Sequence, residues 1–386
     1  MKIKLGLDCL LDEQVNLVKG RRVGLIASPS SVDQQLMNTA ERLYHHPDVN
    51  LVALFGPEHG LRGEAQAGDH VVTYTDARTG LPVYSLYGET RKPSADMLQD
   101  LDTLIFDLQD GGVRFYTYVA TLSHVMEAAA ENGIAVIVID RPTPINGQVV
   151  SGPILDPAYT SFVGPHPIPI RPGMTMGELA RLFNEAFLIN CDLTVVPMSG
   201  WQRNLWFDQT SVPFVPPSPN LPTLSALTLY PGTCLIEGTN LSEGRGTTKP
   251  FEYLGAPWIN AETFADDLNT LHMPGVRFRP VYFVPTFSKY QGEVCAGVQV
   301  FVTNRDLCEP IEVTLTLIAV VKASYPAHFA WRDPWSEESH YPIDLLSGGQ
   351  TMRQHLDADQ PVKDLIGAWQ DDLQTFIDLR ANFVLY

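Results

Sequence analysis

The chain has 386 residues, and its 26 Lys and Arg against 44 Asp and Glu give a formal net charge of −18. A surface this acidic repels polyanions, so the sequence disfavours binding to nucleic acid or to anionic membranes. At roughly 100–200 residues per domain the length favours two domains. A hydrophobic content of 45% is typical of a folded, soluble protein rather than a disordered one.

The N-terminal residues and the cysteines bear on compartment and cofactors. The first apolar stretch is interrupted by Asp8, unlike a signal peptide, and no window reaches the roughly 18 apolar residues of a membrane span. We expect a cytoplasmic protein without membrane insertion, or a periplasmic or secreted one if a leader was removed. The cysteines stand singly and favour buried free thiols over a disulfide or metal framework, and no cofactor is expected. They are Cys9, Cys191, Cys234, Cys295 and Cys308.

Between residues 20 and 200, short apolar runs alternate with helical segments. Strands that are apolar throughout and separated by helices are what a parallel sheet covered on both faces requires. The pattern therefore predicts an α/β domain with a Rossmann-like, doubly wound, mostly parallel sheet. The predicted strands are residues 23–27, 51–55, 83–86, 103–108, 135–140 and 193–197, and the predicted helices are 36–45, 94–100, 120–132 and 176–188.

A proline-rich segment favours a domain boundary. Residues 213–222 carry five prolines, which cannot continue a helix or a central strand. We expect an α/β catalytic domain over residues 1–225 and a smaller α+β domain over residues 226–386. In the second domain, strands are predicted at 282–284 and 296–302, and helices at 312–324 and 362–379.

Charged and aromatic residues follow three predicted strands of the first domain. They are Gly56-Pro-Glu58-His59-Gly-Leu-Arg62-Gly, then Asp107-Leu-Gln-Asp110-Gly-Gly-Val-Arg114-Phe-Tyr116-Thr-Tyr118, and Asp140-Arg141-Pro. In open α/β sheets, ligands bind at the carboxyl ends of the strands, so these clusters predict one crevice. Two glycines and a proline around an acid and an imidazole favour a functional loop at Glu58. Asp140 could equally be a helix cap, and the second cluster could be an ion-pair network.

A fourth cluster lies beyond the prolines, and several familiar sites are lacking. It reads Glu237-Gly-Thr-Asn240-Leu-Ser-Glu243-Gly-Arg245-Gly-Thr-Thr.

The sequence contains no P-loop, no G-x-G-x-x-G after the first strand, no G-x-S-x-G and no H-E-x-x-H, which argues against nucleotide binding, serine hydrolases and zincins. A magnesium or manganese site from Glu58, Asp107 and Asp110 is the alternative.

These motifs, with the later Pro285-Thr-Phe-Ser-Lys289, resemble in order the exo-β-N-acetylmuramidases of peptidoglycan recycling, long catalogued as a domain of unknown function. The resemblance spans nearly the whole chain. It implies a Rossmann-like domain and a smaller C-terminal domain with the active site in the cleft between them. It also implies release of non-reducing terminal N-acetylmuramic acid from small muramyl glycans, and it assigns Glu58 as the proposed catalytic residue.

The residue types fit glycoside hydrolysis, in which one carboxyl protonates the leaving oxygen and a second group attacks or activates water. Glu58 suits the acid role if burial raises its pKa, and His59 either orients Glu58 or bonds backbone within its loop. The second group could be Asp110, Glu237, Glu243 or the acetamido group of the substrate. For the lactyl carboxylate the candidates are Arg62, Arg114 and Arg245, while Tyr116 and Tyr118 could pack on the sugar. The other expected substrate contacts are Asp107, Asp140, Arg141, Asn240, Glu243 and Lys289.

Two other functions remain open from the residues alone. One is a metal-dependent hydrolase that uses Glu58, Asp107 and Asp110. The other is a non-catalytic protein that binds peptidoglycan sugars without cleaving them. Release of free sugar from a muramyl–glucosamine disaccharide, with and without chelator, would separate these from the glycosidase.

Overall fold

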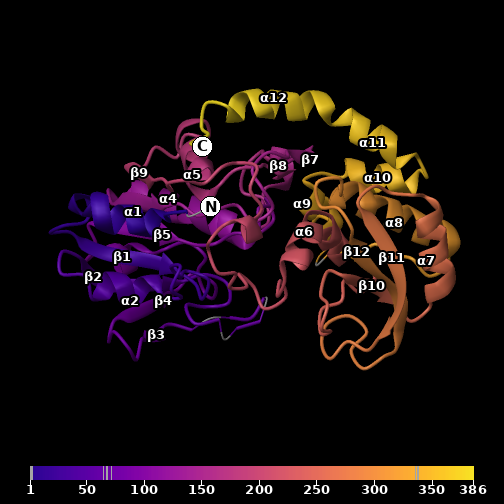
Figure 1. Cartoon of the computed structure of the whole chain (residues 1–386), viewed down its shortest axis with the longest axis horizontal. Coiled ribbons are helices and arrows are strands. Elements are labelled where there is room, and N and C mark those ends of the chain that lie inside the picture. The colour runs from indigo at the N-terminus through magenta and orange to yellow at the C-terminus, as the bar shows by residue number, and fades with distance from the viewer. Residues whose placement is uncertain (1–2, 64, 67, 71, 335, 337–338) are drawn as a thin grey trace. The chain divides into compact units, whose positions relative to one another are not determined.

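The computed structural model describes residues 3–63, 65–66, 68–70, 72–334, 336 and 339–386 (Figure 1). The chain divides into two compact units, each assembled from separate stretches of sequence. Unit 1 comprises Met1–Val150, Pro172–Pro219 and Ile377–Tyr386, and unit 2 comprises Ser151–Arg171 and Asn220–Phe376.

Unit 1 is built on a seven-stranded sheet with the order β3-β4-β2-β1-β5-β6-β9. All neighbouring pairs are parallel except β3 with β4. Without the short edge strand β3, this is the doubly wound Rossmann order, in which strand order reverses between β1 and β5. The fold class predicted from the apolar runs is thus confirmed. The strands are β1 Arg22–Ala27, β2 Asn50–Gly56, β3 Tyr74–Thr75, β4 Pro82–Ser85, β5 Thr103–Asp107, β6 Ala135–Ile139 and β9 Leu193–Val196.

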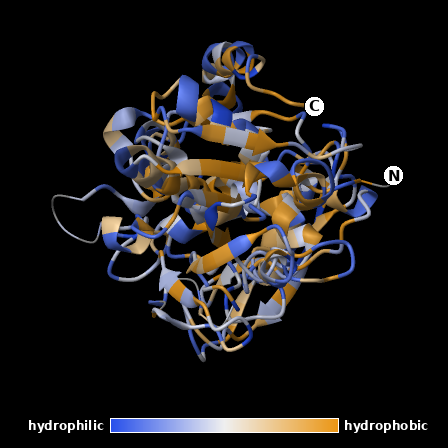
Figure 2. Ribbon diagram, turned by 90° about the vertical axis from the view of Figure 1, so that its left-hand side faces the viewer, coloured by the Kyte–Doolittle hydropathy of each residue, from blue (hydrophilic) through white to orange (hydrophobic). Residues whose placement is uncertain are grey.

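The central strands are apolar because both of their faces are buried. Every residue of β5 is buried, and Leu25, Ile105 and Ile137 belong to one core cluster with residues of the flanking helices. Figure 2 shows these strands largely in the hydrophobic colour. The helices of this part of the chain are α1 Gly6–Glu13, α2 Thr39–Tyr44, α3 Ala95–Leu98, α4 Thr117–Asn132, α5 Met176–Glu185 and the short η1 Val15–Leu17 and η3 Phe207–Gln209.

Unit 2 contains a three-stranded antiparallel sheet in the order β10-β12-β11 and a two-stranded hairpin, β7-β8. Its strands are β7 Ser151–Ile154, β8 Pro169–Arg171, β10 Tyr253–Ala256, β11 Val276–Phe283 and β12 Cys295–Val302. Its helices are η2 Pro157–Tyr159, α6 Leu224–Thr233, η4 Cys234–Gly238, α7 Ala261–Thr270, α8 Pro310–Ser324, α9 Pro342–Ser347, α10 Thr351–Asp357 and α11 Val362–Ala368; α12 Gln370–Arg380 begins here and ends in unit 1.

Several predicted elements differ from the structure in extent, among them the helix predicted at 120–132, which begins at Thr117, and the helix predicted at 176–188, which ends at Glu185. The helix predicted at 36–45 begins only at Thr39, because Leu36 has φ 64° and the Asn38 side chain caps the helix by accepting from the Ala40 N–H. The strand predicted at 282–284 is the end of the longer β11. The helix predicted at 362–379 is two helices, since the Trp369 N–H donates to Ile366 O and closes α11 with a tight turn. Residues 213–222 form no helix or strand, as expected.

Across the described part of the chain, no helix combines the length and apolar character that crossing a bilayer requires.

Candidate active site

Glu58 lies in a sharp loop that follows β2. A side chain at Gly56 would come within 2.9 Å of the Leu61 nitrogen, so the loop can fold back only on a glycine there. His59 and Gly60 both have left-handed backbone, with φ of 74° and 79°. The turn buries Glu58 to 8% exposure at the carboxyl edge of the sheet. The unusual backbone inferred from the Gly-Pro-Glu-His-Gly sequence is therefore present.

The Glu58 carboxyl accepts hydrogen bonds on both oxygens. The Gly68 N–H donates to Oε1 at 3.0 Å, and the Thr117 hydroxyl donates to Oε2 at 2.7 Å. The Tyr87 hydroxyl also interacts with this carboxyl. Tyr118 donates to the backbone oxygen of Glu58 at 3.3 Å, which ties the loop to helix α4. The carboxyl is thus held by one donor from its own loop and one from the start of α4.

His59 bonds within its own loop. Its Nδ1 lies 3.0 Å from the backbone oxygen of Ala65. This is the backbone contact expected as the alternative to orienting Glu58.

Asp107 and Arg141 form a buried bidentate ion pair. Arg141 Nε and Nη2 lie 2.5 Å and 2.9 Å from the two Asp107 carboxylate oxygens, and Arg141 also donates to Val32 O. Both side chains are under 5% exposed. The pair joins the second cluster to the third through Arg141, whereas the sequence suggested a network with Arg114, and it engages both Asp107 oxygens that a metal would need. Among the residues described, no three His, Cys, Asp or Glu side chains gather around a common metal position.

Asp110 is fully buried, and among the described residues it makes no ion pair. Its Oδ2 accepts from the Gly112 N–H at 2.8 Å. Burial raises its pKa to about 7, against the effect of that hydrogen bond. The neighbouring Gln109 amide donates to the backbone oxygens of Asp110 and Pro142 and closes the loop over this carboxyl.

Asp140 lies against the start of helix α5, whose N-cap residue is Thr175. It accepts from the Thr175 hydroxyl at 2.6 Å, the Gly177 N–H at 2.8 Å and the Tyr386 hydroxyl at 2.8 Å. Burial raises its pKa to about 6. Asp140 is thus not the N-cap residue itself, but it accepts from the Gly177 N–H in the first turn of α5 and from the Thr175 cap.

Arg114, Tyr116 and Tyr118 are buried inside unit 1. Burial lowers the pKa of Arg114 to about 9. The two tyrosine rings pack edge to face at 4.9 Å, and both hydroxyls donate to Pro217 O, at 2.8 Å from Tyr116 and 3.3 Å from Tyr118. In this arrangement both rings pack in the protein interior.

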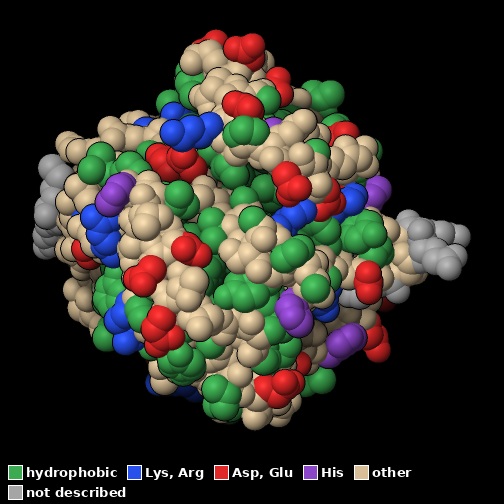
Figure 3. All heavy atoms as spheres, turned by 90° about the vertical axis from the view of Figure 1, so that its right-hand side faces the viewer, with side chains coloured by type: hydrophobic (Ala, Val, Ile, Leu, Met, Phe, Trp, Pro, Cys, Tyr) green, Lys and Arg blue, Asp and Glu red, His purple; other side chains and the backbone are tan. Residues whose placement is uncertain are grey.

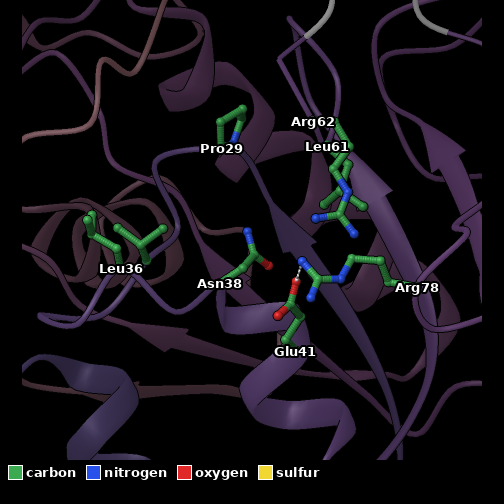
Figure 4. Close-up of a pocket in the computed structure, with 8 residues that line it drawn as sticks. Pro29, Leu36, Asn38, Glu41, Leu61, Arg62 and Arg78 are labelled. Atoms are coloured by element: carbon green, nitrogen blue, oxygen red, sulfur yellow. Dashed lines mark ion pairs between the residues drawn. The ribbon is translucent and has the colours of Figure 1, made fainter.

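Arg62 lines a pocket of about 300 Å³ beside the Glu58 loop (Figure 4). Its guanidinium pairs with the buried Asp76 at 2.6 Å. A second arginine, Arg78, reaches into the pocket and pairs with Glu41 at 2.7 Å, the dashed line in Figure 4. The arginines are therefore balanced by carboxylates, and the Arg62 side chain is 32% exposed.

The candidates in unit 2 form a second charged cluster. Arg245 pairs with Glu237 at 2.8 Å and Glu243 at 3.5 Å, and Lys289 pairs with Glu243 at 3.1 Å. These two carboxylates raise the pKa of Arg245 against its burial. The Asn240 side chain bonds backbone only, donating to His328 O and accepting from the Ala330 N–H.

Sequence reasoning missed the side chains that hold Glu58. Thr117 lies inside the Arg114–Tyr118 motif. The feature of the sequence that could have indicated it is a threonine at the start of a helix that follows a strand. Tyr87 follows β4, and its closeness to Glu58 depends on β4 pairing with β2, which the sequence does not indicate.

A Rossmann-like sheet with buried carboxyl groups at the carboxyl ends of its strands is the arrangement of an α/β enzyme that acts on a small molecule. Two family descriptions match the chain: "Exo-beta-N-acetylmuramidase NamZ, N-terminal" over residues 23–225 and "Exo-beta-N-acetylmuramidase NamZ, C-terminal" over residues 228–386. The chain belongs to the NamZ family of exo-β-N-acetylmuramidases, and its class is that of the glycosidases.

A curated relative and two crystal structures are similar over the full length. Peptidoglycan beta-N-acetylmuramidase NamZ of Bacillus subtilis (strain 168) is 49% identical, covering 100% of this chain and 92% of the relative. A DUF1343 family protein from Bacteroides fragilis superposes with a TM-score of 0.90 at 38% identity, covering 100% of this chain and 99% of that one. A second DUF1343 protein from the same organism gives 0.75 at 29% identity, with the same coverage.

Proposed function

We propose that this protein is an exo-acting glycosidase that releases non-reducing terminal N-acetylmuramic acid from small peptidoglycan fragments during cell-wall turnover and recycling. The observation that carries the proposal is the Glu58 carboxyl, buried in a glycine-bounded loop at the end of β2 in a member of the NamZ family. The full-length similarity to a peptidoglycan β-N-acetylmuramidase supports the same substrate class.

Glu58 is the proposed general acid. Its carboxyl is buried, and donors on both oxygens fix its orientation, which positions a single proton for the glycosidic oxygen. Protonated Glu58 would transfer that proton as the bond from the anomeric carbon to the leaving oxygen breaks.

The second group is proposed among Asp110, Glu237, Glu243 and the substrate's acetamido group. Glu243 pairs with both Arg245 and Lys289, and a carboxylate held by two cations suits a nucleophile or base. Asp110, with a pKa of about 7, is protonated in a large fraction near neutral pH and suits a proton donor. Glu237 is paired with Arg245 and is the most exposed of the three carboxyls.

Recognition of the lactyl carboxylate is proposed for Arg62, Arg114 or Arg245. Arg62 is the most exposed of the three, so a substrate carboxylate could replace Asp76 as its partner with little rearrangement. Replacing the arginine that binds the lactyl carboxylate with alanine should lower the ratio of activity on muramides to activity on glucosaminides.

The decisive experiment replaces Glu58 with glutamine and measures turnover of a chromogenic N-acetylmuramide. Glutamine keeps the side-chain size but removes the transferable proton, so kcat should fall by about 100- to 10,000-fold. Glu131→Gln is the matched control, because Glu131 is exposed and pairs only with Lys92, and it should keep full activity. Near-normal turnover by folded Glu58→Gln would remove Glu58 from the mechanism. Wild-type activity should be unchanged by EDTA.

A further inference from the structure

Helix α4 begins beside the Glu58 carboxyl without a cap of its own. Its N-cap residue Tyr116 makes no side-chain cap hydrogen bond, and the first turn contains no acidic residue. The first residue of the helix, Thr117, instead donates its hydroxyl to Glu58 Oε2 at 2.7 Å. A carboxylate at this position interacts favourably with the unpaired N–H groups and the dipole of a 16-residue helix. The charge that normally caps a helix is therefore supplied by the carboxyl of the proposed acid.

Tyr87 approaches the same carboxyl from the neighbouring strand. Parallel pairing of β4 with β2 brings Ser85 opposite Gly56, and the Leu86 N–H donates to Gly56 O at 2.8 Å. This register places Tyr87 next to the Glu58 loop, where its hydroxyl interacts with the carboxyl. Burial and the nearby Glu58 charge raise the pKa of Tyr87 to about 12. Tyr87 is therefore a neutral donor over the whole working pH range.

The remaining titratable groups around Glu58 leave its charge without a direct counter-ion. The buried Tyr118 also has a raised pKa and is neutral. Arg91 lies over the outer face of the Tyr87 ring, 5.4 Å from its centroid, and the His59 ring bonds Ala65 O. Within the described residues, Glu58 makes no ion pair. Its carboxyl oxygens instead accept from neutral donors, the Thr117 hydroxyl and the Gly68 N–H, and the neutral Tyr87 side chain interacts with the same carboxyl.

We propose that Thr117 and Tyr87 are positioning residues that set the protonation equilibrium of the Glu58 carboxyl, and with it the pH range of the reaction. The proposal rests on the proposed function, in which protonated Glu58 donates to the leaving oxygen. Donors to a carboxylate favour its charged form over its protonated form, and Thr117 donates directly to Glu58. Removing such a donor therefore favours the protonated form.

The experiment compares pH profiles of kcat/KM for Thr117→Val, Thr117→Ser and Tyr87→Phe. The activity of a general acid declines as pH rises through its pKa, so the alkaline limb should move up by about one pH unit in Thr117→Val and Tyr87→Phe. Thr117→Ser keeps the hydroxyl and should restore the wild-type limb. Thr121→Val is the matched control on the same helix, since the buried Thr121 hydroxyl donates only to Thr117 O.

A second measurement follows the same equilibrium without using activity. The carbon-13 titration of glutamate carboxyl groups, with the Glu58 signal identified by its loss in Glu58→Gln, should show the same upward shift in Thr117→Val and none in Thr121→Val. Coincident Glu58 titrations in wild type and Thr117→Val would overturn the proposal. Movement of the acid limb instead of the alkaline limb would support the positioning role and overturn the acid role of Glu58. A wild type without muramidase activity would overturn the proposed function, while the titration would still decide this inference.

Discussion

Buried carboxyl groups in this protein differ in the partner that offsets their burial. Asp107 pairs with the Arg141 guanidinium, whereas Asp110 is equally buried and its carboxyl interacts with backbone N–H groups. The difference appears in the pKa of Asp110, which burial raises to about 7. A carboxyl with such a pKa favours the protonated form in the folded state and releases protons on unfolding.

Asp110→Asn should therefore stabilise the fold at alkaline pH. The folded pKa lies above the unfolded value of about 4, so the stabilisation from Asp110 is complete below about pH 4 and is lost as pH rises through 7. Asparagine is neutral throughout, and the free energy of unfolding at pH 8 should exceed that of wild type by about 2 kcal/mol, with little difference at pH 4. Urea unfolding at both pH values measures this.

The matched comparison is Asp48→Asn. Asp48 is a half-buried carboxyl whose pKa is lowered by a hydrogen bond to Lys19, so any effect should be small and of opposite sign. Equal unfolding free energies of wild type and Asp110→Asn at pH 8 would contradict a raised pKa at Asp110.

At the scale of elements, the sequence predicted the buried strands well and some of the helices poorly. Continuous apolar runs predicted β1, β2 and β5 correctly. A strand that is covered on both faces needs apolar side chains at nearly every position, so its sequence is distinctive. Helix α6 was missed because Pro231 and Gly232 suggest a turn, while burial of nearly the whole helix removes the polar face that gives a helix its periodicity. The Glu58 loop could be predicted, but Tyr87 beside it depends on strand order, which is a property of the folded sheet.

Gly232 allows α6 to lie directly against the start of α8. A Cβ at this position would come within 1.8 Å of the Pro310 oxygen, a backbone atom that cannot move aside alone. Gly232→Ala should therefore lower the free energy of unfolding by about 3 kcal/mol or more. Gly367→Ala in α11 is the matched control, because a Cβ there meets nothing within 4 Å, and it should stabilise by about 0.5–1 kcal/mol. Similar melting temperatures for the two variants would contradict the close contact between Gly232 and the Pro310 oxygen.

At the scale of the whole molecule, the net charge of −18 is spread over the surface. In Figure 3, acidic side chains are scattered over the face shown, with basic ones between them. The arginines at the candidate sites are paired with carboxylates, as in Arg62 with Asp76 and Arg245 with Glu237. The protein as a whole therefore repels an anionic substrate at long range.

Raising the ionic strength should speed the encounter with a muramide. Between about 10 and about 150 mM salt, screening should raise kcat/KM about twofold while kcat stays constant, because only association is affected. Steady-state kinetics with the chromogenic muramide measure both. If kcat/KM fell with salt, the attraction of the substrate by positive charge at the site would have to exceed its repulsion by the acidic surface.

The path of the chain through the two units bears on how the protein is made. The chain leaves one unit for the other after residues 150, 171, 219 and 376, and its final segment, Ile377–Tyr386, returns to unit 1. There the Tyr386 hydroxyl donates to Asp140, and the Leu385 N–H donates to Glu178, both at 2.8 Å. During synthesis on the ribosome, unit 1 therefore cannot form these contacts until Tyr386 has been added to the chain. Unit 2 already has all its residues at Phe376, so the unit that comes second in the sequence can be the first to finish folding.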